Sequence, residues 1–192
     1  MGNESSAEAD DNVVTLPGAN RHRHGEGETS PEEAAINDIA GKDQDLKQGL
    51  MAILSRDSSF DAEQFVGGAK MAYEMIVTGF ADGDKRALKG LLAREVYENF
   101  AAVIDDRTKR GEKVQASFVG IEKADITAAE LNRDEAQVTV KFVSQMISAT
   151  LDSSDEIIEG DLQEVAEVID VWTFARSVKS RGPNWKLVAT DD

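Results

Sequence analysis

The sequence contains no cysteine among its 192 residues. Disulfide bridges, thiolate metal sites and cysteine nucleophiles are therefore excluded. No stretch approaches the roughly 20 consecutive apolar residues that a membrane-spanning helix needs. The two histidines, His22 and His24, lie near the N-terminus, outside the segments with periodic apolar residues. A Ser-His-Asp site or a histidine-ligated zinc site inside a folded domain is therefore excluded as well.

Positive charge is also scarce. The chain carries 21 basic and 37 acidic residues, which gives a formal net charge of −16. Nucleic-acid binding needs clustered lysine and arginine to neutralise phosphates, so no nucleic-acid partner is expected. An anionic membrane surface repels such a chain as a whole. Any membrane attachment must therefore rest on apolar insertion rather than on charge.

The N-terminal residues, 1–31, have few apolar side chains and are rich in Asp, Glu, Gly, Asn and Ser. A segment of this composition cannot bury enough surface to offset the entropy of ordering it. We therefore predict a disordered acidic tail over 1–31. Its start has the features of neither a secretory signal nor a transit peptide.

Residues 32–57 are predicted to form an amphipathic helical arm. Ser30 and Pro31 are typical of a helix start. Within a second helix, predicted over Lys42–Leu54, four apolar residues fall on one face: Leu46, Leu50, Ile53 and Leu54. Two roles remain open for this face. It packs on the following domain, or it detaches to contact membrane lipid or a partner protein.

The remaining residues, 58–192, are predicted to form one α+β domain. Its first half, Phe60 to Gly111, reads as two helices that meet at Asp82-Gly83-Asp84, where Gly83 ends one helix and Asp84 caps the next. Apolar residues recur along the first of these helices at helical spacing: Phe65, Ala69, Ala72, Ile76 and Phe80. The neighbouring Gly67 and Gly68 predict a face that another backbone approaches closely.

After Gly111 the apolar residues follow a period of two, which indicates β-strands. Phe118, Gly120 and Glu122 share one predicted face, and Val119 and Ile121 share the other. We predict four strands, over Val114–Ile126, Gln137–Ser148, Val165–Val178 and Asn184–Ala189, with hairpin turns at residues 131–134 and 181–184 and an acidic loop over 152–160. Helices followed by a run of strands indicate an α+β fold with an antiparallel sheet.

One carboxylate is a candidate for chemistry. Asp170 alternates onto the same predicted strand face as Val168, Trp172 and Phe174. Apolar surroundings raise the pKa of a carboxyl group and allow it to act as a base. The alternative is a structural ion pair with Arg176 or a neighbouring lysine. We predict no catalytic residue, metal site or cofactor.

Three segments carry a family resemblance. They are FxxxxFxxGAKxAYExIVxxFAxGD from Phe60, LxxLLxxEVYxxF from Leu88, and VxDVWTFAR from Val168. Together they resemble the Tim-type translocase domain family, the C-terminal domain of the forty-four-kilodalton subunit of the mitochondrial inner-membrane import motor. The resemblance spans about residues 49–188, and the chain looks like an alphaproteobacterial relative.

The resemblance implies a cone-shaped α+β fold similar to nuclear transport factor two, with helices packed on a curved sheet around an apolar pocket. Phe65, Phe80, Asp170, Trp172 and Phe174 are the expected pocket or core residues. It also implies a non-enzymatic adaptor at the cytoplasmic face of a bacterial inner membrane, held through an N-terminal anchor that this chain lacks. Chaperone tethering belongs to a basic N-terminal region in the family, so it is not expected of this acidic tail. The alternative is a small-molecule-binding or enzymatic member that uses Asp170 in the pocket.

Overall fold

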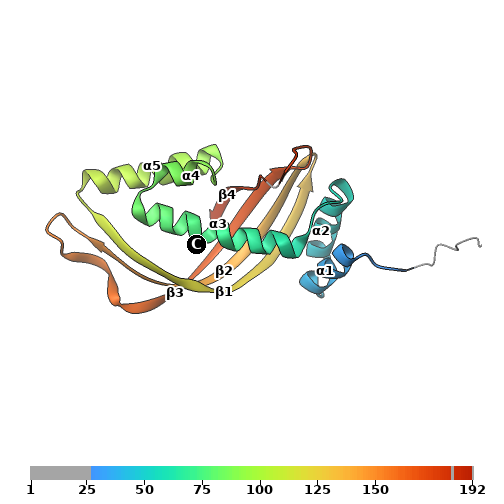
Figure 1. The fold of residues 1–192 in the computed structure, drawn as a ribbon, viewed down its shortest axis with the longest axis horizontal. Helices are drawn as coiled ribbons and strands as arrows, with labels where there is room; N and C mark the ends of the chain where they lie inside the picture. The colour runs from blue at the N-terminus through green and yellow to red at the C-terminus, as the bar shows by residue number, and fades with distance from the viewer. Residues whose placement is uncertain (1–26, 183, 192) are drawn as a thin grey trace, which may run out of the picture.

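The computed structural model describes residues 27–182 and 184–191. Five helices come first and four strands follow, which confirms the expected α+β class (Figure 1). The helices are α1 (Pro31–Ala40), α2 (Gln44–Arg56), α3 (Ala62–Asp82), α4 (Lys85–Lys89) and α5 (Arg94–Lys109). Most of the predicted tail, residues 1–26, lies outside the described residues. None of the helices in the described ranges is long and apolar enough to cross a membrane.

The strands form one antiparallel sheet in the order β1-β2-β3-β4. They are β1 (Lys113–Asn132), β2 (Glu135–Leu151), β3 (Ile157–Ser177) and β4 (Lys186–Asp191). The long strands curve, and α3 runs across their concave side (Figure 1). The first predicted hairpin turn is confirmed, since Asn132 pairs with Glu135 across Arg133 and Asp134.

Strand β1 departs from the predicted alternation of faces. Its register to β2 shifts between Phe118 and Gly120, between Ile121 and Lys123, and again beyond Ile126. Each shift inserts one extra residue, as a β-bulge does. Phe118 and Ile121 therefore both pack against the core, although the sequence placed them on opposite faces. The same bulges hide the strand's continuation to Asn132 from a period-two pattern.

The starts of the first three helices follow from their sequence. Ser30, Asp43 and Asp61 each accept a hydrogen bond from an exposed helical amide, which stabilises an N-terminus. Gly83 ends α3 in the left-handed conformation, with φ of 69°, and Asp84 caps α4. Both predictions for this turn are therefore confirmed.

The second long helix predicted before Gly111 is wrong, because the chain breaks into α4 and α5. Residues 90–93 leave the helix and join the sheet. The amide of Leu187 donates to the carbonyl of Leu91 at 3.0 Å, and the amide of Ala93 donates to the carbonyl of Leu187 at 2.9 Å. The backbone of this break thus pairs with β4 instead of continuing a helix.

Strand β3 begins at Ile157, so the predicted acidic loop is shorter than expected. Asp152 closes the turn, because its carboxylate accepts hydrogen bonds from the amides of Ser154 and Glu156 at 2.8 and 3.0 Å. Gly160 pairs with Ala149 of β2 and has a φ of 81°, and a Cβ atom there would meet the carbonyl oxygen of Ser148 at 2.2 Å. Only glycine fits this position without movement of the sheet.

Candidate functional site

A buried polar cluster lies on the concave side of the sheet, under α3. The Tyr73 hydroxyl donates to Oδ2 of Asp170 at 2.6 Å and lies 2.8 Å from Oγ of Ser144. Tyr73 and Ser144 are fully buried. Burial raises the pKa of Tyr73 above its ordinary value, and the hydrogen bond from its hydroxyl to Asp170 raises it further. The hydroxyl therefore stays protonated and acts as a donor.

Of the two structural ion pairs considered for Asp170, the one with Arg176 is wrong, and a pair with a neighbouring lysine stays a prediction. Arg176 lies further along β3 and pairs with Asp57, whereas Asp170 takes its hydrogen bond from Tyr73. Ser144 was a missed member of the cluster. It stands between Phe142 and Met146 on the period-two face of β2, and a lone polar residue on an apolar face was the signal that marked it.

Aromatic side chains surround this cluster. The Tyr73 ring stacks on Phe142 with centroids 4.3 Å apart and lies 4.6 Å from Trp172. Phe174 and Phe65 meet edge to face at 6.1 Å. Trp172, Phe174 and Phe65 are all buried, so these candidates belong to the core. Phe80 lies apart from them and packs on the ring of Phe100 at 5.0 Å.

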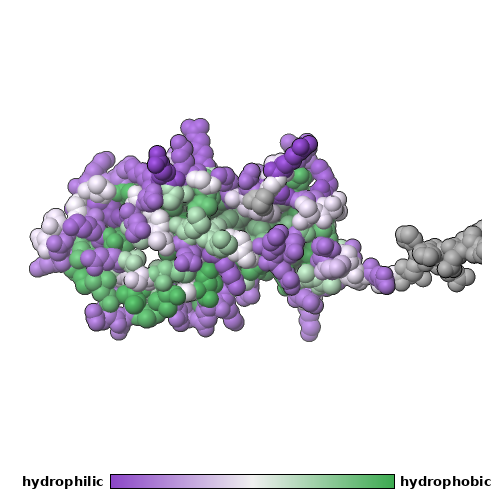
Figure 2. All heavy atoms as spheres, viewed as in Figure 1, coloured by the Kyte–Doolittle hydropathy of each residue, from purple (hydrophilic) through white to green (hydrophobic). Residues whose placement is uncertain are grey.

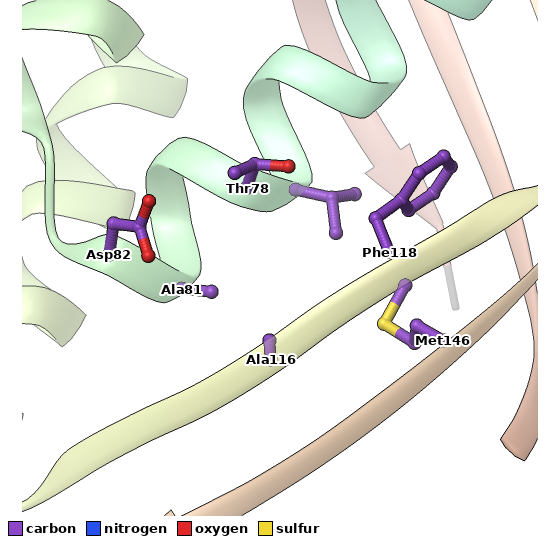
Figure 3. A pocket seen from close by; sticks show the side chains of 7 residues that line it. Thr78, Ala81, Asp82, Ala116, Phe118 and Met146 are labelled. Atoms are coloured by element: carbon purple, nitrogen blue, oxygen red, sulfur yellow. The ribbon is translucent and has the colours of Figure 1, made fainter.

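A small cavity lies one helical turn beyond Tyr73, between α3 and the first two strands (Figure 3). Its volume is about 30 Å³, which is enough for a water molecule or two and far below that of a ligand site. Five apolar side chains, Thr78 and one ionisable residue, Asp82, line it: Val77, Thr78, Ala81, Asp82, Ala116, Phe118 and Met146. Between α3 and the described strands, this narrow, mostly apolar space lies where the family resemblance implied a pocket.

The cavity is near the part of the sheet that helices cover least. Helix α5 makes its main contacts with α4 and β4, not with the first strands. In Figure 2 the surface is hollowed at the left, between the region of α5 and the lower strands, and green atoms edge this hollow. Val103 of α5 is half exposed. Among the cavity-lining side chains, Met146 is the most adaptable in shape, because methionine is unbranched and has three rotatable side-chain bonds.

Helix α2 packs on β1, with its apolar face turned inward. Leu46, Leu50 and Ile53 are buried at 5, 0 and 0% exposure, and Leu54 is partly buried. Gly49 touches the strand so closely that a Cβ atom there would lie 1.9 Å from the carbonyl oxygen of Ala129. Of the two roles left open for this apolar face, packing on the domain is the one seen in the structure, with β1 as its partner.

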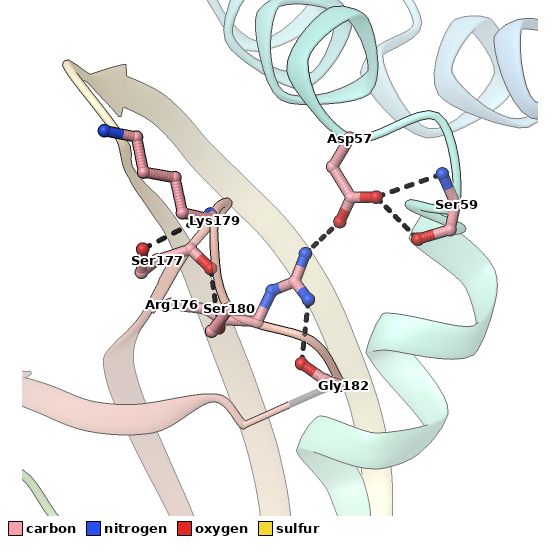
Figure 4. Close-up of polar contacts among 7 residues, drawn as sticks. All are labelled: Asp57, Ser59, Arg176, Ser177, Lys179, Ser180 and Gly182. Carbon is pink, nitrogen blue, oxygen red and sulfur yellow. Dashed lines mark hydrogen bonds and ion pairs between the residues drawn. The ribbon is translucent and has the colours of Figure 1, made fainter.

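Ion pairs hold the C-terminal end of α2 to the neighbouring end of the sheet, and Figure 4 shows the pair between Arg176 and Asp57. Arg56 pairs with Asp134 in the β1–β2 turn at 2.6 Å. Arg176 pairs with Asp57 and donates to the carbonyl of Gly182 at 2.9 Å. Burial raises the pKa of Asp57, but hydrogen bonds from the Ser59 hydroxyl and amide, together with Arg176, outweigh it, so the net pKa is lowered.

In the part of the chain that the structure describes, the side chains are not arranged to bind a metal ion. No group of three or more His, Cys, Asp or Glu side chains there is placed to hold an ion. The polar cluster contributes one carboxylate and two hydroxyls, all engaged with one another. The arrangement is suited to holding α3 on the sheet, and the adjacent cavity is lined mostly by apolar side chains.

Part of this sequence is similar to known proteins. The Tim44-like domain matches residues 46–192. The human mitochondrial import inner membrane translocase subunit TIM44 is 20% identical over 147 residues, which cover 75% of this chain and 32% of that protein. The Drosophila melanogaster large ribosomal subunit protein mL45 is 25% identical over 145 residues, covering 73% and 40%.

Among solved structures, a putative dehydratase of the NTF2-like family from Streptomyces avermitilis is similar at a TM-score of 0.35 and 18% identity, covering 67% of this chain and 94% of that one. The chain spans about a third of the human relative's length and two fifths of the fly relative's. The matched region begins within α2 and runs through all four strands. This chain therefore belongs to the Tim44-like domain family.

Proposed function

We propose that this chain is a non-enzymatic adaptor that associates peripherally with a membrane and binds an apolar group, a lipid acyl chain, between α3 and the first two strands. The observation that carries the proposal is the cavity beside Tyr73, whose lining is apolar except for Thr78 and Asp82. Family membership supports it, because the human relative is named as an inner membrane translocase subunit. We further propose a bacterial inner membrane and its cytoplasmic face as the location.

The cavity must widen to hold an acyl chain, because ligand sites usually measure about 300–1,000 Å³. Widening is feasible at this place. Met146 and Phe118 form one wall, and α5 has its main contacts on α4 and β4. An acyl chain entering there would replace the side-chain contacts that are lost with similar apolar contacts. Widening the cavity around an acyl chain therefore costs less free energy than opening it to water.

In this proposal α2 supports the site and remains on β1. Its release would expose Leu46, Leu50 and Ile53, at roughly 1.5–3 kcal/mol each and so about 5–9 kcal/mol together. That cost is of the order of the whole stability of a typical domain, about 5–15 kcal/mol. Direct insertion of this helix face into a membrane would therefore compete with folding itself.

Enzymatic use of Asp170 is the weaker alternative. An active site would bring two or more ionisable groups together in an open pocket. The cavity lining contributes one, Asp82, and Asp170 is engaged by Tyr73 outside that lining. The lining favours binding over catalysis.

Flotation of the full chain with liposomes tests the proposal. Vesicles of phosphatidylcholine, alone or with phosphatidylglycerol, are compared at low and high salt. Because apolar contact is not screened by ions, we expect flotation that salt does not reduce. Absence of flotation with both vesicles at both salts would remove the lipid proposal and leave a partner protein as the ligand of the cavity.

Two variants then locate the contact. Ala81→Leu fills the cavity and should reduce flotation, whereas Ala102→Leu, at an exposed position of α5, is its matched control. In the double variant Arg56→Cys/Asp134→Cys, a short thiol-reactive linker joins the two cysteines and so fixes the end of α2 to the β1–β2 turn. The linker reacts only at these two positions, because the sequence has no other cysteine. Linked protein should float as well as unlinked protein. Loss of flotation on linking would show that α2 has to separate.

A further inference from the structure

Most of the outer edge of β3 has no partner strand. Strand β4 pairs only with the last part of β3, from Val171 to Ala175, because β4 ends at Asp191, opposite Val171. Within the part of the chain that the structure describes, no strand pair or other backbone–backbone hydrogen bond occupies the outer edge of residues 157–169. In Figure 1 this stretch, in orange, forms the lower left margin of the sheet. Such an edge presents amides and carbonyls to which another strand can be added.

This edge lacks the usual devices that hinder strand addition. Proline and lysine are common devices, and residues 157–169 contain neither. The outer edge of β1, by contrast, is interrupted by three register shifts. Strand β3 has one irregularity, because residues 162–165 oppose Ile147 alone, but residues 166–169 pair regularly with β2. This regular stretch lies directly beside the part of β3 that β4 covers.

The surroundings of the open edge are acidic. Between Lys141 and Arg176 the chain has eight acidic residues and no basic one. Glu164 and Glu167 adjoin the regular stretch and are exposed, and neither takes part in an ion pair within the described residues. Two copies of this edge would repel each other, whereas a strand that carries lysine or arginine would be attracted to it. The charge therefore favours a basic partner over a second copy of this chain.

The two faces of the regular stretch call for different side chains on an added strand. Glu167 and Ile169 lie on the face away from α3, and Ala166 and Val168 lie on the face toward it. Ile169 is half exposed. A lysine or arginine on the first face would place its charge beside Glu167 and its methylene stem over Ile169. Apolar side chains on the second face would lie beside Ala166 and Val168.

We propose that an extended segment of another protein, with basic and apolar residues in alternation, adds to the edge of β3 along residues 166–169. The added strand lies in line with β4 and extends the sheet. Its backbone supplies hydrogen bonds, and its basic side chains supply the selectivity for this acidic edge. The site is separate from the cavity under α3, so the contact does not depend on lipid binding.

A fluorescent peptide in which lysine and valine alternate tests the proposal with the full chain. The comparison peptide has the same sequence with methyl groups on its backbone amides, so it keeps every charge and side chain but cannot pair as a strand. We expect the methylated peptide to bind at least about tenfold more weakly in fluorescence anisotropy. Equal binding of the two peptides, or no binding of the unmethylated one, would overturn the proposal.

Charge reversal at the edge tests the position of the contact. Glu164→Lys/Glu167→Lys should weaken binding of the unmethylated peptide at least about tenfold. Glu63→Lys/Glu74→Lys is the matched control, because both residues are exposed on α3 and the net charge changes by the same amount. This control should weaken binding much less. Equal weakening by the two double variants would show attraction by net charge alone and would contradict the proposed site.

Hydrogen exchange of the full chain with the same peptide locates the added strand. Amides of residues 166–169 should gain protection, and amides of residues 113–117 on the outer edge of β1 should not. Protection on β1 instead would contradict the assignment. Dimerisation of the chain in sedimentation that Glu164→Lys/Glu167→Lys abolishes, together with no binding of the peptide, would make a second copy the occupant and would refute a basic partner.

Discussion

Substitution of Gly49 by alanine should lower the stability of the protein if α2 packs on β1, and should raise the stability of the helix if α2 is free. In a free amphipathic helix the change stabilises by about 1 kcal/mol, because glycine is the poorer helix former. In the structure the added Cβ atom would lie 1.9 Å from the carbonyl oxygen of Ala129 and 2.6 Å from its carbonyl carbon. These are backbone atoms of β1, so no side-chain rotation relieves the overlap.

The helix or the strand must therefore shift by more than 1 Å to reach an ordinary contact distance. Overpacking of this kind usually costs about 1–3 kcal/mol, and here it opposes the gain in helix propensity. Because the contact is far below the usual limit, we expect the upper part of that range and a net loss of about 2 kcal/mol. For a chain of this length that lowers Tm by about 4–8 °C.

Thermal and urea unfolding of Gly49→Ala, followed by circular dichroism, measure this effect. Gly67→Ala is the matched control. It makes the same substitution in a helix interior, but with open space around the new atom, and it should stabilise by about 0.5–1 kcal/mol. If Gly49→Ala stabilises the protein as much as Gly67→Ala does, α2 does not pack on β1 and the proposed supporting role fails.

Three further predictions concern the core and the ion pair. Tyr73→Phe removes a hydroxyl that bonds both the fully buried Ser144 and the partly buried Asp170 and should destabilise by about 1–3 kcal/mol in urea unfolding, since both hydrogen bonds are lost; an unchanged midpoint would contradict the cluster. The pKa of Asp57 is lower in the folded protein than its ordinary value of 3.8. The ionised carboxylate therefore stabilises the fold at any pH above 3.8, and this stabilisation is lost as the pH falls through the folded-state pKa. Asp57→Asn should therefore reduce the acid sensitivity of unfolding between pH 2 and 5, and an identical acid profile would oppose this assignment. Trp172→Ala should cost about 3–5 kcal/mol as a large core truncation, whereas unchanged stability with altered lipid binding would move Trp172 into the site.

Local chemistry predicted the helix ends well. Ser30, Gly83 and Asp84 have the predicted roles because capping depends only on near neighbours in the chain. The break before α5 was missed for the opposite reason. Residues 90–93 leave the helix to pair with Leu187, nearly 100 positions later, and no local pattern contains that partner.

The site was predicted less well than the fold. Apolar periodicity marked Trp172 and Phe174 as inward-facing, and they are buried, but it does not distinguish a core position from a pocket wall. It also left the role of the α2 face open, because periodicity shows that a face is apolar and not what covers it. The partner of Asp170 required the sheet to place β3 under Tyr73, a contact across 97 positions.

Hydrogen exchange of the full chain, with and without vesicles of phosphatidylcholine and phosphatidylglycerol, tests the central claim most directly. If an acyl chain enters beside Tyr73, amides around Val77–Asp82 and Ala116–Phe118 should gain protection while the amides of α2 keep theirs. The opposite pattern, with α2 losing protection and the cavity segments unchanged, would show that the helix leaves β1 to insert, and it would contradict binding at the cavity.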